Sequence, residues 1–235
     1  MPRRRKPGGG HVSVSRDQTV TLHRGKGRKA SSRRWLERQL NDPYVSEARR
    51  RGYRSRAAFK LIELDEKFGL LRKGHRIVDL GAAPGGWTQI ALEGVGPSGK
   101  VVAIDLSPVD PIGGAIILEG DMRDAATLVR LSDALGGKAD IVLSDMAAPA
   151  TGHAPTDHLR IIGLAEAALN FAEDALAPGG IFVAKVLQGG TERELLDRLK
   201  RGFKRVAHAK PEASRKESAE MYVVAIGFRG GEKEG

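Results

Sequence analysis

The chain has 235 residues, 40% of them hydrophobic and 29% charged, which suits one α/β domain with a sizeable core and a tail. No apolar run approaches the length of a membrane span, and no apolar segment follows the basic N-terminal residues, so we expect a soluble, cytoplasmic protein without a signal peptide. The absence of cysteine excludes disulfides, thiolate metal sites and cysteine nucleophiles, and we expect no metal site.

The formal net charge of +10 is concentrated at one end of the chain. Residues 1–60 hold 18 of the 39 Lys and Arg and only 4 of the 29 Asp and Glu, which leaves 21 basic against 25 acidic residues for the remainder. A basic segment on a slightly acidic body indicates a polyanionic partner, because neutralised phosphates release counterions. The alternative is a solvated tail without a specific partner.

Composition divides the chain into three regions. Residues 1–34 mix Gly, Ser, Arg and Lys with few large apolar side chains, so they bury too little surface to offset the entropy of ordering. We therefore predict a disordered basic arm at 1–34, one folded domain at 35–230 and a short tail at 231–235.

The first predicted helix spans Tyr53–Gly69, with Ser55 as its N-cap and Gly69 as its stop. Its apolar side carries Ala58, Leu61, Ile62 and Leu64, and its polar side carries Arg56, Lys60 and Lys67. From residue 76 onward, short apolar runs alternate with helical stretches, which predicts a βαβ series. The predicted strands are Ile77–Leu80, Val101–Leu106, Ile116–Leu118, Ile141–Leu143 and Ile181–Leu187.

The clearest predicted helix runs over Thr156–Ala177, capped by Thr156 and ended by Pro178-Gly179-Gly180. A helix over Thr191–Arg201 and strands over Phe203–His208 and Met221–Phe228 complete the chain. Because no helix separates the last two strands, they should pair antiparallel. The predicted fold is α/β, a doubly wound, mostly parallel seven-stranded sheet with one antiparallel strand.

Several polar residues lie at the carboxyl ends of the predicted parallel strands. Ligands of doubly wound sheets bind at the carboxyl ends of the parallel strands. The residues at or just beyond such ends are Asp79, Asp105, Asp121, Asp145 and Lys185, and Glu220 starts the reversed strand at the same edge. We therefore expect one functional rim.

A glycine-rich turn, Gly81–Gly86, lies between the first strand and the next helix, where such turns bring backbone close to a cofactor. A dinucleotide fingerprint needs glycine where Ala83 stands, and Pro84 has no N–H for a phosphate. Asp105, 24 residues after Gly81, suits the ribose hydroxyls of a nucleoside. This pattern favours S-adenosylmethionine, although the turn could be a plain β-to-α connection and Asp121 a helix cap.

Four motifs occur together: Asp79-Leu80-Gly81-Ala82-Ala83-Pro84-Gly85-Gly86-Trp87, Leu143-Ser144-Asp145-Met146, Phe182-Val183-Ala184-Lys185 and Glu220-Met221-Tyr222. As a set they resemble the FtsJ/RrmJ family, S-adenosylmethionine-dependent RNA ribose 2′-O-methyltransferases whose bacterial members modify a uridine of large-subunit (23S) ribosomal RNA. The resemblance spans roughly residues 35–230. One departure is the loop Ala147-Ala148-Pro149-Ala150, where relatives often have Ala-Pro-Asn.

The resemblance implies particular site residues. It places the family's catalytic Lys-Asp-Lys-Glu tetrad at Lys60, Asp145, Lys185 and Glu220. It places the cofactor contacts at Gly85, Trp87, Asp105, Asp121 and Asp145. It also implies ribosomal RNA in the assembled or assembling large subunit as the partner, and we expect a monomer.

The residues themselves support proton abstraction from a hydroxyl, which methyl transfer to ribose requires. Lys185 interrupts an apolar strand, and an interior lysine is costly unless it is paired or neutral. Burial and Lys60 would favour the neutral amine, whereas Asp145 and Glu220 would favour the ammonium, and the sequence leaves this balance open. Alternatively, Lys185 snorkels to the surface, Lys60 is a solvated helix residue and Glu220 is a surface carboxylate.

Two basic stretches are predicted to flank the rim and to contact RNA. The first comprises Arg33, Arg34, Arg38, Arg49, Arg50, Arg51, Arg54 and Arg56, and the second comprises Lys200, Arg201, Lys204, Arg205, Lys210, Arg215 and Lys216. An aromatic content of 5% argues against a broad base-stacking platform, so we expect recognition through phosphates and shape.

Other functions remain open at this point. A dehydrogenase would share the sheet but conflicts with Ala83 and Pro84. A catalytically silent ribosome-assembly factor would share the fold, and transfer RNA or an mRNA cap would be alternative substrates of the same chemistry.

Deletion of residues 1–34 tests the predicted arm, which holds 11 Lys and Arg and one acid, Asp17. The plot of log RNA affinity against log salt should become shallower by roughly 0.7–0.9 for each phosphate that the arm neutralises in the intact protein. Cofactor affinity, measured in parallel, should not change. An unaltered salt slope would show that the arm does not touch RNA.

Overall fold

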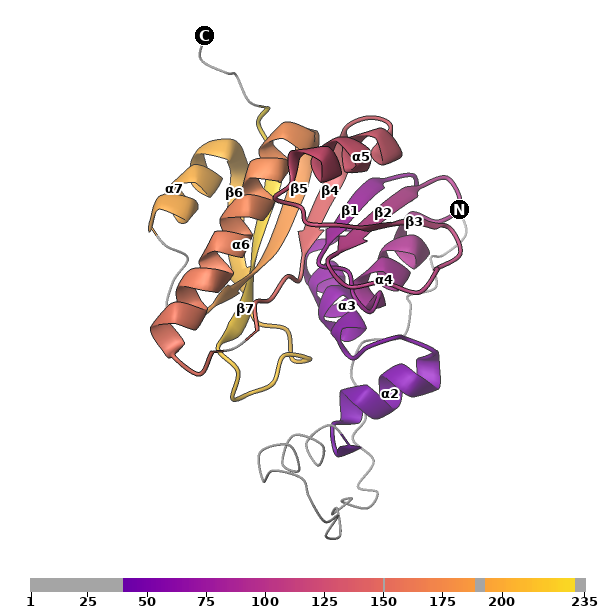
Figure 1. Ribbon diagram of the computed structural model, residues 1–235, viewed down its shortest axis with the longest axis vertical. Coiled ribbons are helices and arrows are strands. Elements are labelled where there is room, and N and C mark those ends of the chain that lie inside the picture. Colours follow the sequence, from indigo (N-terminus) through magenta and orange to yellow (C-terminus); the bar gives the residue numbers. More distant parts are fainter. Residues whose placement is uncertain (1–39, 150, 189–192, 231–235) are drawn as a thin grey trace, which may run out of the picture.

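The computed structural model describes residues 40–149, 151–188 and 193–230 (Figure 1). The predicted arm at 1–34 and tail at 231–235 lie outside the described residues. The helices are α2 (Pro43–Arg51), α3 (Ala57–Phe68), α4 (Gly86–Val95), α5 (Ala125–Leu135), α6 (Ala154–Ala175) and α7 (Arg193–Gly202). The strands are β1 (Arg76–Leu80), β2 (Lys100–Asp105), β3 (Ala115–Glu119), β4 (Ala139–Ser144), β5 (Leu176–Leu187), β6 (Phe203–Ala209) and β7 (Glu220–Phe228).

The strands form one seven-stranded sheet in the order β3-β2-β1-β4-β5-β7-β6. The pairs from β3 through β5 are parallel, whereas β7 runs antiparallel to both β5 and β6. The strand order reverses its direction between β1 and β4, the switch point of a doubly wound sheet. The predicted fold class is confirmed, including the single reversed strand.

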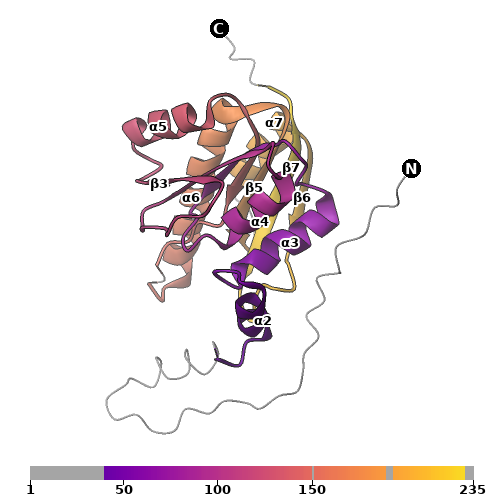
Figure 2. The same cartoon turned by 90° about the vertical axis from the view of Figure 1, so that its right-hand side faces the viewer.

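Helices cover both faces of the sheet (Figures 1 and 2). Alternate strand residues point to opposite faces: Ile77 packs in a core with the α3 and α4 side chains, and Val78 packs in a core with those of α5, α6 and α7. This double coverage explains why the predicted central strands are apolar runs rather than alternating ones. Within the described ranges, no helix combines the length and apolarity needed to cross a membrane.

Two predicted helix starts are wrong. In α3 the N-cap position is Arg56, without a side-chain cap, and the Ser55 hydroxyl is buried without a hydrogen-bond partner among the described residues. A Cβ on Gly86 would lie 2.5 Å from that hydroxyl oxygen, so Ser55 packs against the start of α4. In α6 the cap is His153, because Pro155 suits the first turn, where its missing N–H costs nothing.

The end of α6 also differs from the prediction. Pro178-Gly179-Gly180 does not stop the helix, because β5 already begins at Leu176, which pairs with Ala139 and is buried. The ladder between β4 and β5 shifts register at this point, and such an irregularity accommodates proline and glycine inside a strand.

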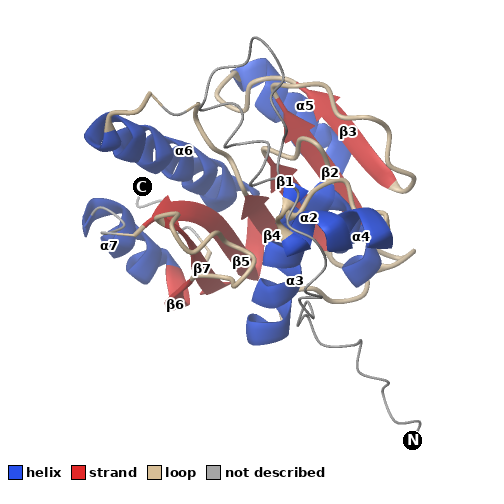
Figure 3. Ribbon diagram, turned by 90° about the horizontal axis from the view of Figure 1, so that it is seen from below, coloured by secondary structure: helices blue, strands red, loops and turns tan. Residues whose placement is uncertain are grey.

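Helix α2 was not predicted as an element, although the sequence carries its end signals. The Asp42 carboxylate accepts a hydrogen bond from the Tyr44 N–H, Pro43 starts the helix and Gly52 ends it with a φ of 75°. Figure 3 views the molecule from the end at which α2 lies.

Asp79 lies in β1, and its side chain is completely buried. Thr88 donates a 2.7 Å hydrogen bond to Oδ2, and Oδ1 has no partner among the described residues. Burial, together with the charges of Asp145 and Asp105, raises the pKa of Asp79 to about 7. The folded protein therefore holds a proton here at a pH where the unfolded chain releases it.

Asp79→Asn tests this buried proton through the pH dependence of unfolding. Because the folded-state pKa is raised above the ordinary aspartate value of 3.8, the free energy of unfolding should fall as the pH rises from about 4 to about 7. The amide does not titrate, so chemical denaturation of Asp79→Asn should give a flatter profile over this window. Asp133→Asn, at an exposed position of α5, is the control and should keep the wild-type slope. Equal slopes in all three proteins would contradict the raised pKa.

Candidate active site

Four charged side chains predicted as a tetrad lie together at the rim. Lys60 Nζ lies 2.6 Å from Glu220 Oε1 and 3.8 Å from Asp145 Oδ2. Lys185 Nζ lies 2.8 Å from Asp145 Oδ1 and 3.6 Å from Glu220 Oε2. It also donates to the main-chain oxygen of Asp145 at 2.9 Å. Each ammonium group therefore faces both carboxylates.

Sheet register explains this convergence. Ser144 pairs with Ala184, so Asp145 and Lys185 follow at the same level of neighbouring strands. Across the next ladder Lys185 pairs with Tyr222, two residues from Glu220. The period of two in a strand turns all these side chains to the face covered by α3, from which Lys60 reaches them.

The cluster is largely withdrawn from water. The exposed fractions of the side chains are 11% for Lys60, 9% for Lys185, 15% for Asp145 and 16% for Glu220. Burial opposes ionisation of Glu220, but the positive charges of Lys60 and Lys185 outweigh it and lower its pKa to about 2. Two positive and two negative charges thus compensate one another in a small, poorly solvated volume.

Two further residues complete the cluster. The fully buried Tyr222 hydroxyl donates to Asp145 Oδ1 at 2.6 Å and lies 3.3 Å from Glu220 Oε1. Burial and these two carboxylates raise the pKa of Tyr222 well above its usual value. Ser214, also buried, donates to Glu220 Oε1 at 2.9 Å. Because side chains of a strand alternate between its two faces, the sequence could have placed Tyr222 on the same face as Glu220. No sequence pattern predicts that Ser214, in a loop, contacts Glu220.

The glycine turn between β1 and α4 lies beside the cluster. A Cβ on Gly81 would come within 2.5 Å of the Met146 side chain and 3.0 Å of its Cα. Gly85 has a φ of 110°, and a Cβ there would lie 2.6 Å from Ile112. Gly81 also has a positive φ, of 76°, so both positions need glycine for close packing and for a left-handed backbone.

The predicted cofactor residues fall into two groups. Asp105, at the end of β2, accepts hydrogen bonds from the main-chain N–H of Ala83 at 2.9 Å and of Ser107 at 2.8 Å, so it joins the glycine turn to the next strand. Asp121 accepts from the Arg123 guanidinium, and these bonds lower its pKa to about 2. Both carboxylates remain partly exposed at the rim.

Trp87 differs from the other predicted cofactor residues because its indole belongs to the core. The side chain is 2% exposed, donates from Nε1 to the Ala57 carbonyl at 2.8 Å and packs 5.5 Å from the Tyr222 ring. Only its main chain, in the first turn of α4, faces the glycine turn.

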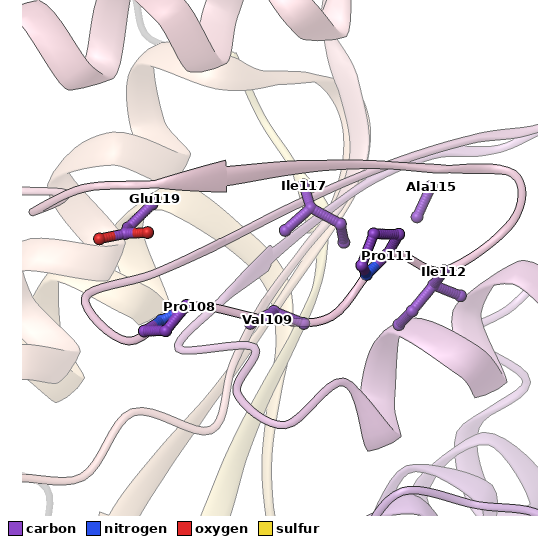
Figure 4. Close-up of a pocket in the computed structure, with 7 residues that line it drawn as sticks. All are labelled: Pro108, Val109, Pro111, Ile112, Ala115, Ile117 and Glu119. Atoms are coloured by element: carbon purple, nitrogen blue, oxygen red, sulfur yellow. The ribbon is translucent and has the colours of Figure 1, made fainter.

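A shallow hollow of about 410 Å³ lies between β3 and the preceding loop (Figure 4). Its lining residues are Pro108, Val109, Pro111, Ile112, Ala115, Ile117 and Glu119. None of them belongs to the predicted site, but Ile112 also lies against Gly85. The loop that lines the hollow therefore also borders the glycine turn.

The prediction that both basic stretches flank the rim is only partly correct. Lys200 and Arg201 end α7, and Phe203 pairs with Phe228, at the far end of β7 from Glu220. Lys204 and Arg205 follow at that same far end, whereas Lys210, Arg215 and Lys216 lie in the loop that leads to Glu220. Because a strand rises about 3.3 Å per residue, the length of β7 separates the tetrad from the first four residues of this stretch, Lys200, Arg201, Lys204 and Arg205.

Within the first stretch, several guanidinium groups are already engaged inside the protein. Arg50 and Arg51 pair with Glu47, and Arg56 bonds to Asp42 and to the Ala213 carbonyl. Arg33, Arg34 and Arg38 lie outside the described residues.

Comparison with known proteins identifies the family. The model of the FtsJ-like methyltransferase family matches residues 53–228. A protein of Paramagnetospirillum magneticum named ribosomal RNA large subunit methyltransferase E is 62% identical, over 96% of this chain and 95% of its own length. A protein of the same name from Acidiphilium cryptum is 60% identical over 93% and 96%.

A solved structure agrees as well. A ribosomal RNA methyltransferase from Plasmodium falciparum superposes with a TM-score of 0.68 at 33% identity, covering 76% of this chain and all of the other. The resemblance expected from the four motifs is thereby confirmed, and with it the enzyme class of a methyltransferase. The chain belongs to the FtsJ-like methyltransferase family.

Proposed function

We propose that this protein transfers a methyl group from S-adenosylmethionine to the ribose 2′-hydroxyl of a uridine in 23S ribosomal RNA, within the assembled or assembling large subunit. The observation that carries the proposal is the buried pair of lysines between two carboxylates, next to the glycine turn. The names of the relatives, at about 60% identity over nearly their whole length, support the ribosomal substrate. The proposal places the protein in the cytoplasm, acting as a monomer, since one chain supplies all four side chains.

The rim suits a nucleoside cofactor. The glycine turn, packed at Gly85 against Ile112 and Arg54, borders the rim, and the partly exposed carboxylates of Asp105 and Asp121 offer acceptors for hydroxyl and amino groups. Asp145 is shared with the tetrad, and Trp87 contributes through its main chain because its indole is buried. S-adenosylmethionine, when bound, supplies an electrophilic methyl group.

Within the tetrad, we assign the role of general base to Lys185. Two hydrogen bonds to Asp145 fix its nitrogen at the rim. After the ammonium has released one proton to solvent, the neutral amine can accept the proton of a positioned hydroxyl. The carboxylates of Asp145 and Glu220 then stabilise the ammonium that proton uptake creates. Lys60, held by Glu220 at 2.6 Å, keeps a second positive charge beside the base and orients the acceptor oxygen.

Substitution of Lys185 tests this mechanism. Lys185→Ala should lower methyl transfer by about a hundredfold or more, the range for loss of a general base, and leave S-adenosylmethionine affinity nearly intact. Lys185→Arg should fail as well, because guanidinium stays protonated. The pH at which the wild-type rate rises belongs to the coupled tetrad as a whole. A near-normal single-turnover rate in Lys185→Arg would leave Lys185 only a positioning role.

Asp105→Ala tests the cofactor assignment by calorimetric titration with S-adenosylmethionine. Removal of charge-assisted hydrogen bonds to the ribose should weaken binding about tenfold or more. Asp110→Ala, an exposed carboxylate of the same loop, is the control and should bind normally. Unchanged affinity of Asp105→Ala would remove Asp105 from the site.

The substrate is tested by mapping 2′-O-methyl groups in ribosomal RNA from cells that lack the protein. Loss of one uridine modification in 23S RNA, restored by the wild-type gene but not by Lys185→Ala, is the expected result. An intact methylation map with undermethylated transfer RNA or mRNA caps would redirect the proposal to those substrates. Unchanged methylation of all RNAs would favour a non-catalytic assembly factor.

A further inference from the structure

Arg54 lies in the short segment between α2 and α3, and its guanidinium contacts the glycine turn and the loop between β2 and β3. Nη1 donates to the main-chain oxygens of Pro84 at 3.2 Å and Asp110 at 2.7 Å, and Nη2 donates to that of Pro111 at 2.8 Å. The Arg54 main-chain N–H is fixed in turn by the Gln89 side chain at 2.8 Å. Both ends of the residue are thereby anchored.

The three acceptors come from two different segments. Pro84 belongs to the glycine turn after β1, whereas Asp110 and Pro111 belong to the loop between β2 and β3. Figure 4 labels Pro111 in this loop. The segments meet at Gly85, where an added Cβ would lie 2.6 Å from Ile112 and 3.2 Å from Arg54 Cδ. Arg54 therefore crosses the junction of the two segments that border the proposed cofactor site.

The guanidinium group is suited to this task. Its donors lie in one rigid plane and point in several directions, so one side chain can satisfy carbonyls of separate segments at once. A lysine carries a single ammonium nitrogen, which cannot bridge the same acceptors in that geometry. Main-chain carbonyls occupy three of the five N–H donors of Arg54, which leaves two donors for any other acceptor.

We propose that Arg54 is a positioning residue for the cofactor site, which clamps the glycine turn against the β2–β3 loop, and that it does not bind RNA despite its place in the basic stretch. The inference rests on the proposed use of S-adenosylmethionine. It competes with the expectation that Arg54 forms part of the approach to RNA, and the salt dependence of RNA binding distinguishes the two.

The test compares Arg54→Gln and Arg54→Lys with Arg50→Gln. Arg50 is the matched control, because it lies four residues earlier, is exposed and pairs only with Glu47 among the described residues. Calorimetry should show S-adenosylmethionine affinity about tenfold or more lower in Arg54→Gln, with a smaller decrease in Arg54→Lys and none in Arg50→Gln. In turnover assays Arg54→Gln should raise KM for S-adenosylmethionine while kcat at saturation stays within about twofold.

Three results would overturn the inference. The first is unchanged cofactor affinity in Arg54→Gln. The second is full affinity in Arg54→Lys, since charge alone would then suffice. The third is a salt slope of RNA binding that is shallower in Arg54→Gln by roughly 0.7–0.9, the signature of one neutralised phosphate.

Thermal unfolding without cofactor verifies that the variants fold. If Arg54→Gln does not fold, Arg54→Lys decides alone. Failure of the wild-type protein to bind S-adenosylmethionine would instead refute the proposed function.

Discussion

Compensation of charge inside a poorly solvated rim is the constraint on which the rest of this structure depends. Each of the two ammonium groups lies within 4 Å of both carboxylates. Burial of the two lysines without the carboxylates, or of the two carboxylates without the lysines, would carry a large desolvation penalty. Strands β5 and β7 supply Lys185 and Glu220, Asp145 directly follows β4, and α3 supplies Lys60. Helix α3 therefore serves both as a cover for the sheet and as the element that neutralises Glu220.

Reversal of β7 is the topological feature that makes this compensation available. A parallel strand at this position would end at the rim. Because β7 is antiparallel to β5, it begins at the rim instead. Glu220 thus enters the site at the first residue of its strand, directly after the loop that contains Ser214. That loop is held by the Ala213 main chain, which donates to Glu63 and accepts from Arg56.

The fold followed from the sequence because its signals are local and repeated. Apolar runs of strand length between helical stretches determine a doubly wound sheet, and the lack of a helix before β7 determines its direction. The tetrad followed from motifs, and strand-end placement alone brought Asp145, Lys185 and Glu220 to one rim. Helix starts were less predictable, since a buried contact between Ser55 and Gly86 outweighed a local capping preference. The hydrogen bonds of Arg54 join it to segments 30 and 56 residues away in sequence. No local sequence pattern predicts such contacts.

An aromatic pair connects the two halves of the proposed chemistry. Trp87 starts the helix that follows the glycine turn, and its ring packs 5.5 Å from that of Tyr222, whose hydroxyl donates to Asp145. Both rings are buried, so a continuous series of packed contacts joins the start of α4 to the carboxylate that holds Lys185. In the proposed mechanism, this packing would set the distance between a methyl donor bound at the turn and the base Lys185. Preorganisation of this kind is what an in-line displacement requires, since small errors in approach geometry cost large factors in rate.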